Sequence, residues 1–322
     1  TFTIHKNATV TASALRNSWG VKTLTVDGVL NLTGEGLLYS SGGMTNTITG
    51  TGTINTDKFG VGNVVTYVLD GGIRMNIGAK GICEGTNYDY KLQIKDATIG
   101  ASTNWASAEA IEKEKFQLGA GAKFDTEQYT ITLNGGLSNI EGEVGKITKL
   151  GAGTLVLNAA NTFSGGVTIN AGTVQAGNAS ALGTGAVKIA GGQLSVANVS
   201  LNVSALEIVL SDKYKSGMDG SVAAITGSGS ITLNGNKINL AKGELDSLTI
   251  ATEMTFKIAD ASISSSFTKD NFTLDTGWDG WTITSYTNGV ITLSVPEPSM
   301  FGLLAGLGAL ALVGARRRRK TK

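Results

Sequence analysis

Proline is almost absent from this 322-residue chain, which has two where average usage would give about sixteen. Cysteine and histidine are scarcer still, with Cys83 and His5 as single examples. One cysteine excludes a disulfide framework and a cysteine-based zinc site. One histidine argues against a Ser-His-Asp triad and a histidine-rich metal site. We therefore expect no cofactor and no metal, and we interpret Cys83 as a small buried apolar residue.

Charged residues are also sparse, at 16% of the chain, and the formal net charge is +1. This near-neutral balance conceals an uneven distribution, because six of the 26 basic residues lie after residue 315. Residues 1–295 carry 20 Lys and Arg against 24 Asp and Glu, which gives them a net charge of −4 (20 − 24). An acidic body has no electrostatic basis for binding nucleic acid, so we expect no nucleic-acid partner.

Glycine, by contrast, is abundant, with 45 residues, and it separates short segments in which apolar and polar residues alternate, such as 24–32, 73–77 and 130–135. A period of two, rich in Thr, Val and Ile, predicts half-buried strands, while Gly-Gly, Asn-Gly and Asp-Gly pairs predict tight turns. The stretch 105–115 is rich in Ala and Glu and is expected to be a short helical insertion. The sequence therefore predicts an all-β body over residues 1–295.

A repeat-like segment lies in the middle of this body. Residues 149–157 read KLGAGTLVL, residues 161–166 read NTFSGG and residues 171–174 read AGTV. This segment resembles the autotransporter-associated β-strand repeat, over about 149–196, and the resemblance implies a right-handed parallel β-helix. Such short strands are stable only when stacked rungs bury a continuous column. The residues expected to point into that column are Leu155, Leu157, Val167, Ile169, Val174, Val187, Ile189, Leu194 and Val196.

The end of the solenoid needs a cap, because an open stack of strands would template aggregation. Residues 278–295 fit this role, since two alternating segments flank Asn288 and Gly289, a strong hairpin signal. Three aromatic residues, Trp278, Trp281 and Tyr286, are expected to cover the final rung.

The tail, residues 296–322, differs from everything before it. Both prolines fall in Pro296-Glu297-Pro298, the uncharged apolar run 300–315 follows, and the basic tail 316–322 ends the chain. The run would span about 24 Å as a helix, which predicts a single short transmembrane helix. The arginines of the basic tail are expected to stop transfer and stay cytoplasmic. They are Arg316, Arg317, Arg318 and Arg319.

This order of elements resembles the PEP-CTERM sorting signal of Gram-negative exported proteins. The resemblance implies recognition of Pro296, Glu297 and Pro298 by an exosortase, a membrane-embedded cysteine protease or transpeptidase. We then expect a precursor held in the inner membrane by its tail, and a product at the cell surface or in the extracellular matrix. The chain opens without Met, so we expect a signal peptide to have been removed.

The sequence thus predicts an exported structural or adhesive β-helix protein, with glycans or surface proteins as further partners. The alternative is a carbohydrate-active β-helix enzyme, a polysaccharide lyase or hydrolase. A glycosidase needs two carboxylates on one face, and residues two apart on a strand meet that spacing. The candidate pairs are Glu141 with Glu143 and Asp125 with Glu127, each two residues apart, and Asp275 with Asp279, four residues apart. Such pairs also occur on any solvated strand, so no catalytic residue is predicted.

Overall fold

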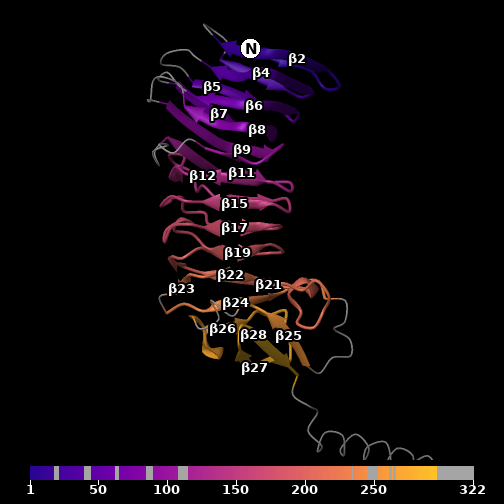
Figure 1. Cartoon of the computed structure of the whole chain (residues 1–322), viewed down its shortest axis with the longest axis vertical. Coiled ribbons are helices and arrows are strands. Elements are labelled where there is room, and N and C mark those ends of the chain that lie inside the picture. The colour runs from indigo at the N-terminus through magenta and orange to yellow at the C-terminus, as the bar shows by residue number, and fades with distance from the viewer. Residues whose placement is uncertain are drawn as a thin grey trace, which may run out of the picture.

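The protein is an elongated β-solenoid closed at one end by a small antiparallel sheet (Figure 1). The computed structural model describes residues 1–17, 22–39, 45–61, 65–84, 90–107, 115–233, 235–245, 253–260, 263 and 266–295. The first strand lies at one end of the long axis and the last described strands lie at the other. The described residues contain no α-helix, which agrees with the all-β prediction.

Two long stacks of parallel strands form most of the wall. The first stack contains β1 (Phe2–Ile4), β3 (Thr23–Val26), β5 (Thr45–Thr49), β7 (Val65–Leu69), β9 (Tyr90–Ala101), β11 (Phe116–Asp125) and β13 (Leu137–Asn139). The second contains β2 (Thr9–Asn17), β4 (Val29–Tyr39), β6 (Thr53–Val61) and β8 (Ile73–Glu84), passes through β9 and β11, and continues with β14 (Ile147–Leu150), β16 (Val167–Ile169), β18 (Val187–Ile189), β21 (Leu206–Leu210), β24 (Ile238–Lys242) and β26 (Phe272–Leu274).

A third parallel stack faces them in the later rungs. It consists of β10 (Trp105–Ala106), β12 (Thr130–Leu133), β15 (Thr154–Leu157), β17 (Thr173–Ala176), β19 (Gln193–Val196) and β22 (Ile225–Gly227). A short parallel pair, β20 (Ser200–Asn202) with β23 (Ser230–Thr232), lies beside it. Within the described ranges, two 3-10 helices occur in connections, η1 (Asp212–Tyr214) and η3 (Lys269–Asn271). Parallel pairing throughout the coil is the arrangement that a β-helix requires.

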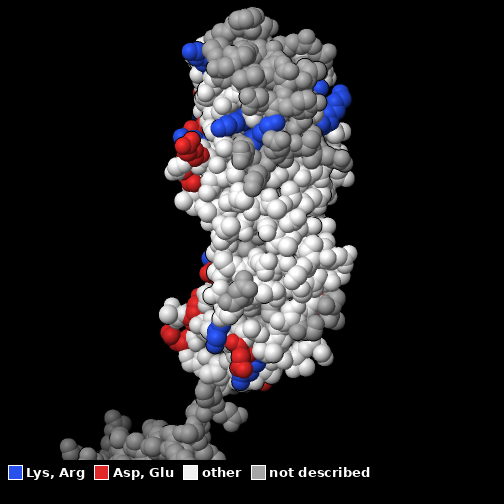
Figure 2. Space-filling view, turned by 90° about the vertical axis from the view of Figure 1, so that its left-hand side faces the viewer, with Lys and Arg blue, Asp and Glu red and all other residues white. Residues whose placement is uncertain are grey.

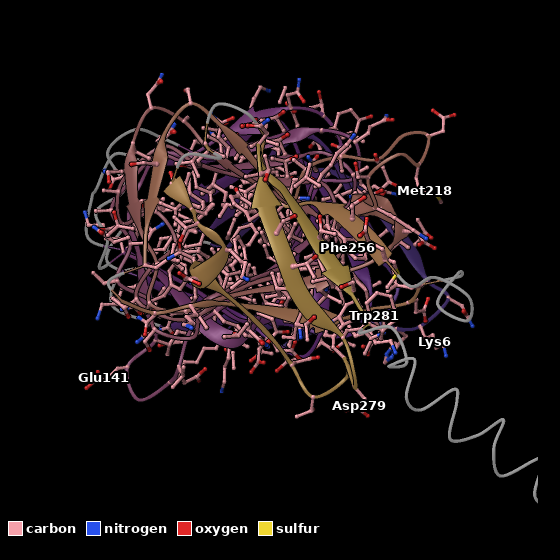
Figure 3. All side chains as sticks on the ribbon, turned by 90° about the horizontal axis from the view of Figure 1, so that it is seen from below. Lys6, Glu141, Met218, Phe256, Asp279 and Trp281 are labelled. Carbon is pink, nitrogen blue, oxygen red and sulfur yellow. The ribbon has the colours of Figure 1, made fainter. Side chains whose placement is uncertain are left out.

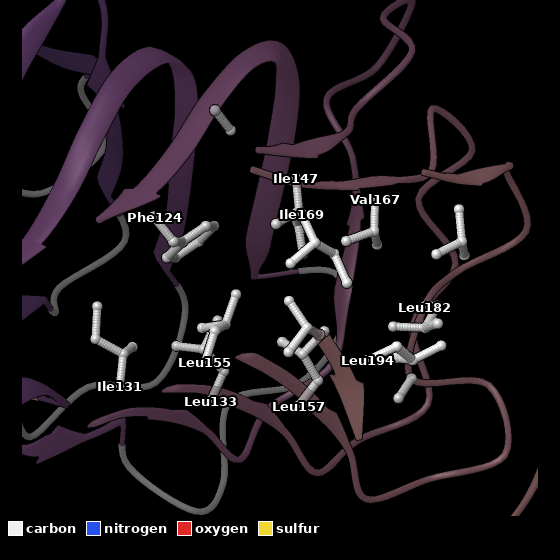
Figure 4. Packing of buried hydrophobic residues seen from close by; sticks show 14 of the residues in the cluster. Phe124, Ile131, Leu133, Ile147, Leu155, Leu157, Val167, Ile169, Leu182 and Leu194 are labelled. Atoms are coloured by element: carbon white, nitrogen blue, oxygen red, sulfur yellow. The ribbon is translucent and has the colours of Figure 1, made fainter. Parts of the chain in front are cut away.

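The inside of the coil is a continuous apolar column, shown in close-up in Figure 4. Alternation places every second residue inward, where it stacks on the equivalent residue of the next rung. All nine residues predicted to point inward are buried, with at most 1% of each exposed. Burying one such side chain contributes about 1.5–3 kcal/mol, so stability accumulates rung by rung.

The C-terminal sheet covers the last rung, as the hairpin signal predicts. β28 (Val290–Ser294) lies between β25 (Glu253–Lys257) and β27 (Thr282–Thr287), and both neighbours are antiparallel to it. The turn that joins β27 to β28 has left-handed backbone at Asn288 and Gly289, with φ of 50° and 81°. Seen from below, this sheet crosses the end of the coil (Figure 3). Trp278 is buried and packs edge-on against Phe256.

Two local predictions need correction. Trp105 and Ala106 begin the stretch expected to be helical, but they form β10 and pair in parallel with β12. The apolar Trp105 is 4% exposed and joins the column, so tertiary packing overrides local helix propensity there. Residues 108–114 of that stretch lie outside the described residues. Cys83 is half-buried rather than buried, and its thiol contacts the carbonyl oxygen of Phe59 at 3.8 Å.

Candidate functional site

The repeat rungs, residues 147–210, are organised around a lysine that points into the protein. Lys149 is fully buried, and it follows Ile147 on the inward side of β14. Its ammonium Nζ donates to the carbonyl oxygens of Leu150 at 2.7 Å, Gly151 at 2.8 Å and Ala171 at 3.2 Å. These acceptors belong to two successive rungs. The lysine therefore ties the turn after β14 to the turn of the next rung.

Burial changes the proton affinity of this lysine. Loss of solvation lowers the pKa of Lys149 to about 8, the carboxylate of Asp125 raises it, and the charge of Lys213 lowers it. An ammonium with three carbonyl partners satisfies all its donors, which is how a buried charge becomes tolerable. The hydrogen bonds of Lys149 to three backbone carbonyl oxygens thus give this side chain a structural role.

Glycines in the same motif allow the rungs to approach closely. A Cβ on Gly153 would lie 1.9 Å from the carbonyl oxygen of Tyr129 in the preceding rung. Gly172 has a φ of +62°, and a Cβ there would lie 2.7 Å from Nζ of Lys149. Any larger residue would push the turns apart. The GAGT and AGT elements are thus the places where backbone stacks on backbone.

Asn161 connects three rungs from inside the wall. Its side-chain oxygen accepts from the backbone N–H of Leu137 at 2.8 Å, and its amide nitrogen donates to the carbonyl oxygen of Ala181 at 2.5 Å. The residue is 3% exposed, and Phe163 beside it is fully buried. In the NTFSGG element, therefore, the asparagine satisfies backbone groups above and below while the phenylalanine fills the column.

The outside of the repeat rungs carries almost no charge. Between residues 150 and 206 the only charged side chain is Lys188, which pairs with Glu207 at 2.6 Å. Figure 2 shows one face on which charged atoms gather toward the two ends of the solenoid, with a largely uncharged band between them. Hydroxyl and amide groups of Thr, Ser, Asn and Gln make up the polar surface of the band.

The N-terminal rungs, residues 1–140, hold a charged cluster formed by Arg74, Asp125 and Glu127. The guanidinium of Arg74 donates to Asp125 and to Glu127, each at 2.7 Å. The Arg74 side chain reaches both carboxylates across the intervening rung of β9, where Gly100 has no side chain in its path. A Cβ on Gly100 would lie 3.0 Å from Nη2 of Arg74 and 2.3 Å from Oδ1 of Asn76. One arginine thus spans the rungs of β8, β9 and β11.

The carboxylate of Asp125 is unsuited to act as a general acid. Burial alone would raise the pKa of Asp125, but hydrogen bonds from Arg74 and the backbone of Glu127, with the charges of Arg74 and Lys149, lower it overall. A general acid at neutral pH needs a raised pKa. Asp125 ends β11, and Glu127 follows it with a φ of 50°, so the two do not share one face of a strand as expected.

The other two carboxylate pairs also lie in turns and not on strands. Glu141 and Glu143 follow β13, and the nearest ammonium to Glu143 is that of Lys95 at 3.8 Å. Asp275 and Asp279 lie between β26 and β27. Figure 3 shows Glu141 and Asp279 at the periphery, pointing away from the body. Neither Glu141 and Glu143, two residues apart, nor Asp275 and Asp279, four apart, therefore share one face of a strand, because all four lie in connections between strands.

Two features are absent from the described residues. No group of three or more His, Cys, Asp or Glu within them could hold a metal ion. Within the same residues, no helix is long and apolar enough to cross a membrane. The predicted sorting residues, Pro296, Glu297, Pro298 and Arg316 to Arg319, and the predicted span 300–315 lie outside the described part of the chain.

Sequence reasoning missed the roles of Lys149 and Asn161, although a signal for the first was present. The alternation that places Ile147 inward also places Lys149 inward, because the two are separated by one residue. A lysine on the apolar side of an alternating strand indicates a buried ammonium that needs backbone partners. Asn161 has no comparable signal, since its neighbours do not alternate.

Comparison with known proteins supports both resemblances. Residues 147–176 match the passenger-associated-transport-repeat family, and residues 294–319 match the PEP-CTERM protein-sorting motif. Neither match is to an enzyme family. Among curated proteins, the chain is 27% identical over 202 residues to the adhesin BmaC autotransporter of Brucella suis biovar 1 (strain 1330). That alignment covers 61% of this chain but 5% of the adhesin, and no solved structure matches the chain.

Proposed function

We propose that this exported, cell-surface β-solenoid has a structural or adhesive role, and that an exosortase processes it through Pro296, Glu297 and Pro298. The supporting observation is the order of elements: a closed solenoid, then directly after β28 a segment that matches the PEP-CTERM motif over residues 294–319. The boundary between folded body and sorting tail is proposed at residues 295 and 296.

The chemistry of the tail suits this role. Two prolines lack backbone donors and keep the motif extended and readable by an enzyme. The apolar run 300–315 would hold the precursor in the inner membrane, with Arg316 to Arg319 on the cytoplasmic side. Cleavage would then release the body toward the cell surface or the extracellular matrix.

The structural or adhesive part rests on the body. Its polar outer surface and closed end suit a rod that presents contacts along its length, as solenoids do. The curated relative is named as an adhesin, which favours an adhesive over a catalytic role. Glycans and surface proteins are the partners proposed for such a surface.

The sorting proposal is tested by replacing Pro296, Glu297 and Pro298 with alanine in the native host. We expect a folded body that accumulates in the inner membrane, as measured by cell fractionation and immunoblotting. Ser299→Ala is the matched control and should be released as the native chain is. A second variant, Arg316 to Arg319 changed to glutamine, separates motif recognition from membrane retention. Normal release of the triple-alanine variant would refute sorting through this motif.

A further inference from the structure

A groove runs along the solenoid on the N-terminal rungs, away from the repeat. Its volume is about 510 Å³, and it is lined by residues from five successive rungs, from Thr11 on β2 to Ser102 and Thr103 after β9. Because each rung contributes one or more of these residues, the groove follows the solenoid axis and not the strands.

Stacked β-bulges create this groove. The register shifts between residues 12 and 14 in β2, 32 and 37 in β4, and 56 and 58 in β6, at equivalent places in consecutive rungs. A bulge bends its strand locally, so aligned bulges form a crease across the sheet. Gly78, which lines the groove, has no side chain to fill it. A Cβ at this position would lie 2.5 Å from Oδ1 of Asp57.

A ladder of asparagine side chains crosses the groove region, and all its hydrogen bonds point the same way along the solenoid. It consists of Asn31, Asn55 and Asn76. The amide of Asn76 donates to the side-chain oxygen of Asn55 at 2.8 Å, and that of Asn55 donates to Asn31 at 2.8 Å. Among the described residues, none accepts from the amide nitrogen of Asn31. The ladder therefore ends in polarised donors that face the groove beside Thr11.

The charges of the groove cancel. Asp57 pairs with Lys80 at 3.1 Å, and the other lining residues are uncharged. What the groove offers is a set of neutral donors and acceptors repeated from rung to rung, about 4.8 Å apart. That spacing is close to the length of one sugar unit in an extended glycan.

We propose that this groove binds a stretch of neutral, extended polysaccharide lying parallel to the solenoid axis. The proposal rests on the proposed adhesive function and names its ligand class and its site. The hydroxyl groups of a polysaccharide match the uncharged amide and hydroxyl groups of the groove. A peptide that binds as an added strand needs a free sheet edge. The groove offers none at β4 and β6, because each of these strands is paired on both sides. No aromatic residue lines the groove, so each sugar binds weakly and affinity rises with chain length.

The test uses the full-length chain, purified in non-ionic detergent, in affinity gels containing dextran, galactomannan, xylan or the acidic polymer alginate. We expect at least one neutral polymer to retard the native chain. Ala79→Trp fills the groove from an exposed position and should weaken that retardation roughly tenfold, or about 1.4 kcal/mol. Ala152→Trp makes the same change at an exposed position in the repeat rungs and should bind as the native chain does. Asn31→Asp provides a second variant, which replaces the terminal donors with a charge and should also weaken binding.

Three outcomes overturn the groove assignment: no retardation by any neutral polymer, retardation by alginate alone, or full binding by both variants with native circular dichroism. Cell adhesion distinguishes this failure from failure of the adhesive role. If cells displaying Ala79→Trp adhere as native cells do while a deletion strain does not, the adhesive role stands and the groove is not its site. If the deletion strain adheres normally while the purified chain binds polysaccharide, the groove stands and the adhesive role falls.

Discussion

The register advances by 19–20 residues per rung between Ile147 and Leu206, whereas it advances by 21–25 residues between Leu24 and Leu118. Both regions bury the same kind of apolar column. They differ in how one rung is tied to the next. The repeat rungs have buried ties from Lys149 and Asn161 to backbone groups, and one exposed ion pair between Lys188 and Glu207. In the N-terminal rungs the ties are side chains on the outer surface, as in the Arg74 cluster and the asparagine ladder.

This difference shows two ways to stack parallel rungs. A short rung leaves no residues for bulges or charged loops, so its turns lie directly on one another and buried polar groups satisfy them. A longer rung bends at bulges, and it carries outward side chains that reach across to neighbouring rungs. The stability of the short rungs should change little with salt concentration, but these rungs should tolerate few substitutions. The longer rungs should tolerate substitution but respond to ionic strength.

The largest effect is expected from Asn161→Ala in the repeat rungs. It leaves the N–H of Leu137 and the carbonyl of Ala181 buried without their side-chain partner, which should cost about 3 kcal/mol. Urea unfolding gives the change in stability, and amide hydrogen exchange at Leu137 locates it. Asn170→Ala is the matched control, because Asn170 is exposed, and it should change stability by less than about 0.5 kcal/mol. Equal stability of both variants would show that the buried tie contributes nothing.

A pH effect of intermediate size is expected from Lys149. Its folded pKa of about 8 lies below its ordinary value of 10.5, so between these values the unfolded chain binds more protons. The contribution of this group to unfolding free energy therefore rises with pH in that window, by up to about 2 kcal/mol between pH 8 and 9.5. Urea unfolding at a series of pH values measures it. Lys149→Met should abolish the rise, whereas Lys188→Met, at an exposed pair, should leave it unchanged. A rise that persists in Lys149→Met would assign it to another group.

The smallest effect is expected from Arg74→Gln in the N-terminal rungs. The pairs of Arg74 are partly exposed, with 28% of its side chain accessible, so their loss should cost about 1 kcal/mol at low salt and less at high salt. Unfolding in 0.05 and 1 M salt, about a fourfold change in screening length, measures the difference. Asn161→Ala should show the same loss at both salt concentrations. If Arg74→Gln were equally insensitive to salt, the two regions would not differ as described.

Much of the fold follows from local pattern, and much of the site does not. Alternation and turn pairs were enough to predict the column through Leu155, Val167 and Val187, because each inward position is set by its own segment. Arg74 and Asp125 are 51 residues apart in the sequence. Whether their side chains meet depends on the number of residues in each intervening rung, and that number varies outside the repeat. The groove depends on bulges that align only when the register of several strands is known. The alternation of apolar and polar residues predicts which side chains each strand buries. To predict contacts between side chains on the outer surface, one must also know the number of residues in every turn of the coil.

The position of β28 has a mechanical consequence. The tail leaves the described body after Val295, at the end of the central strand of the capping sheet, where Ser294 pairs with Glu253 on one side and Thr282 on the other. A pull along that strand would load two hydrogen-bonded ladders at once in shear, instead of peeling a single edge strand. The ring of Trp278 packs against Phe256 of this sheet, and its Nε1–H donates to the carbonyl oxygen of Leu240 on β24 at 3.0 Å, which couples the sheet to the coil. A rod tethered by its C-terminal end would thus carry tension through a strand that is paired on both sides.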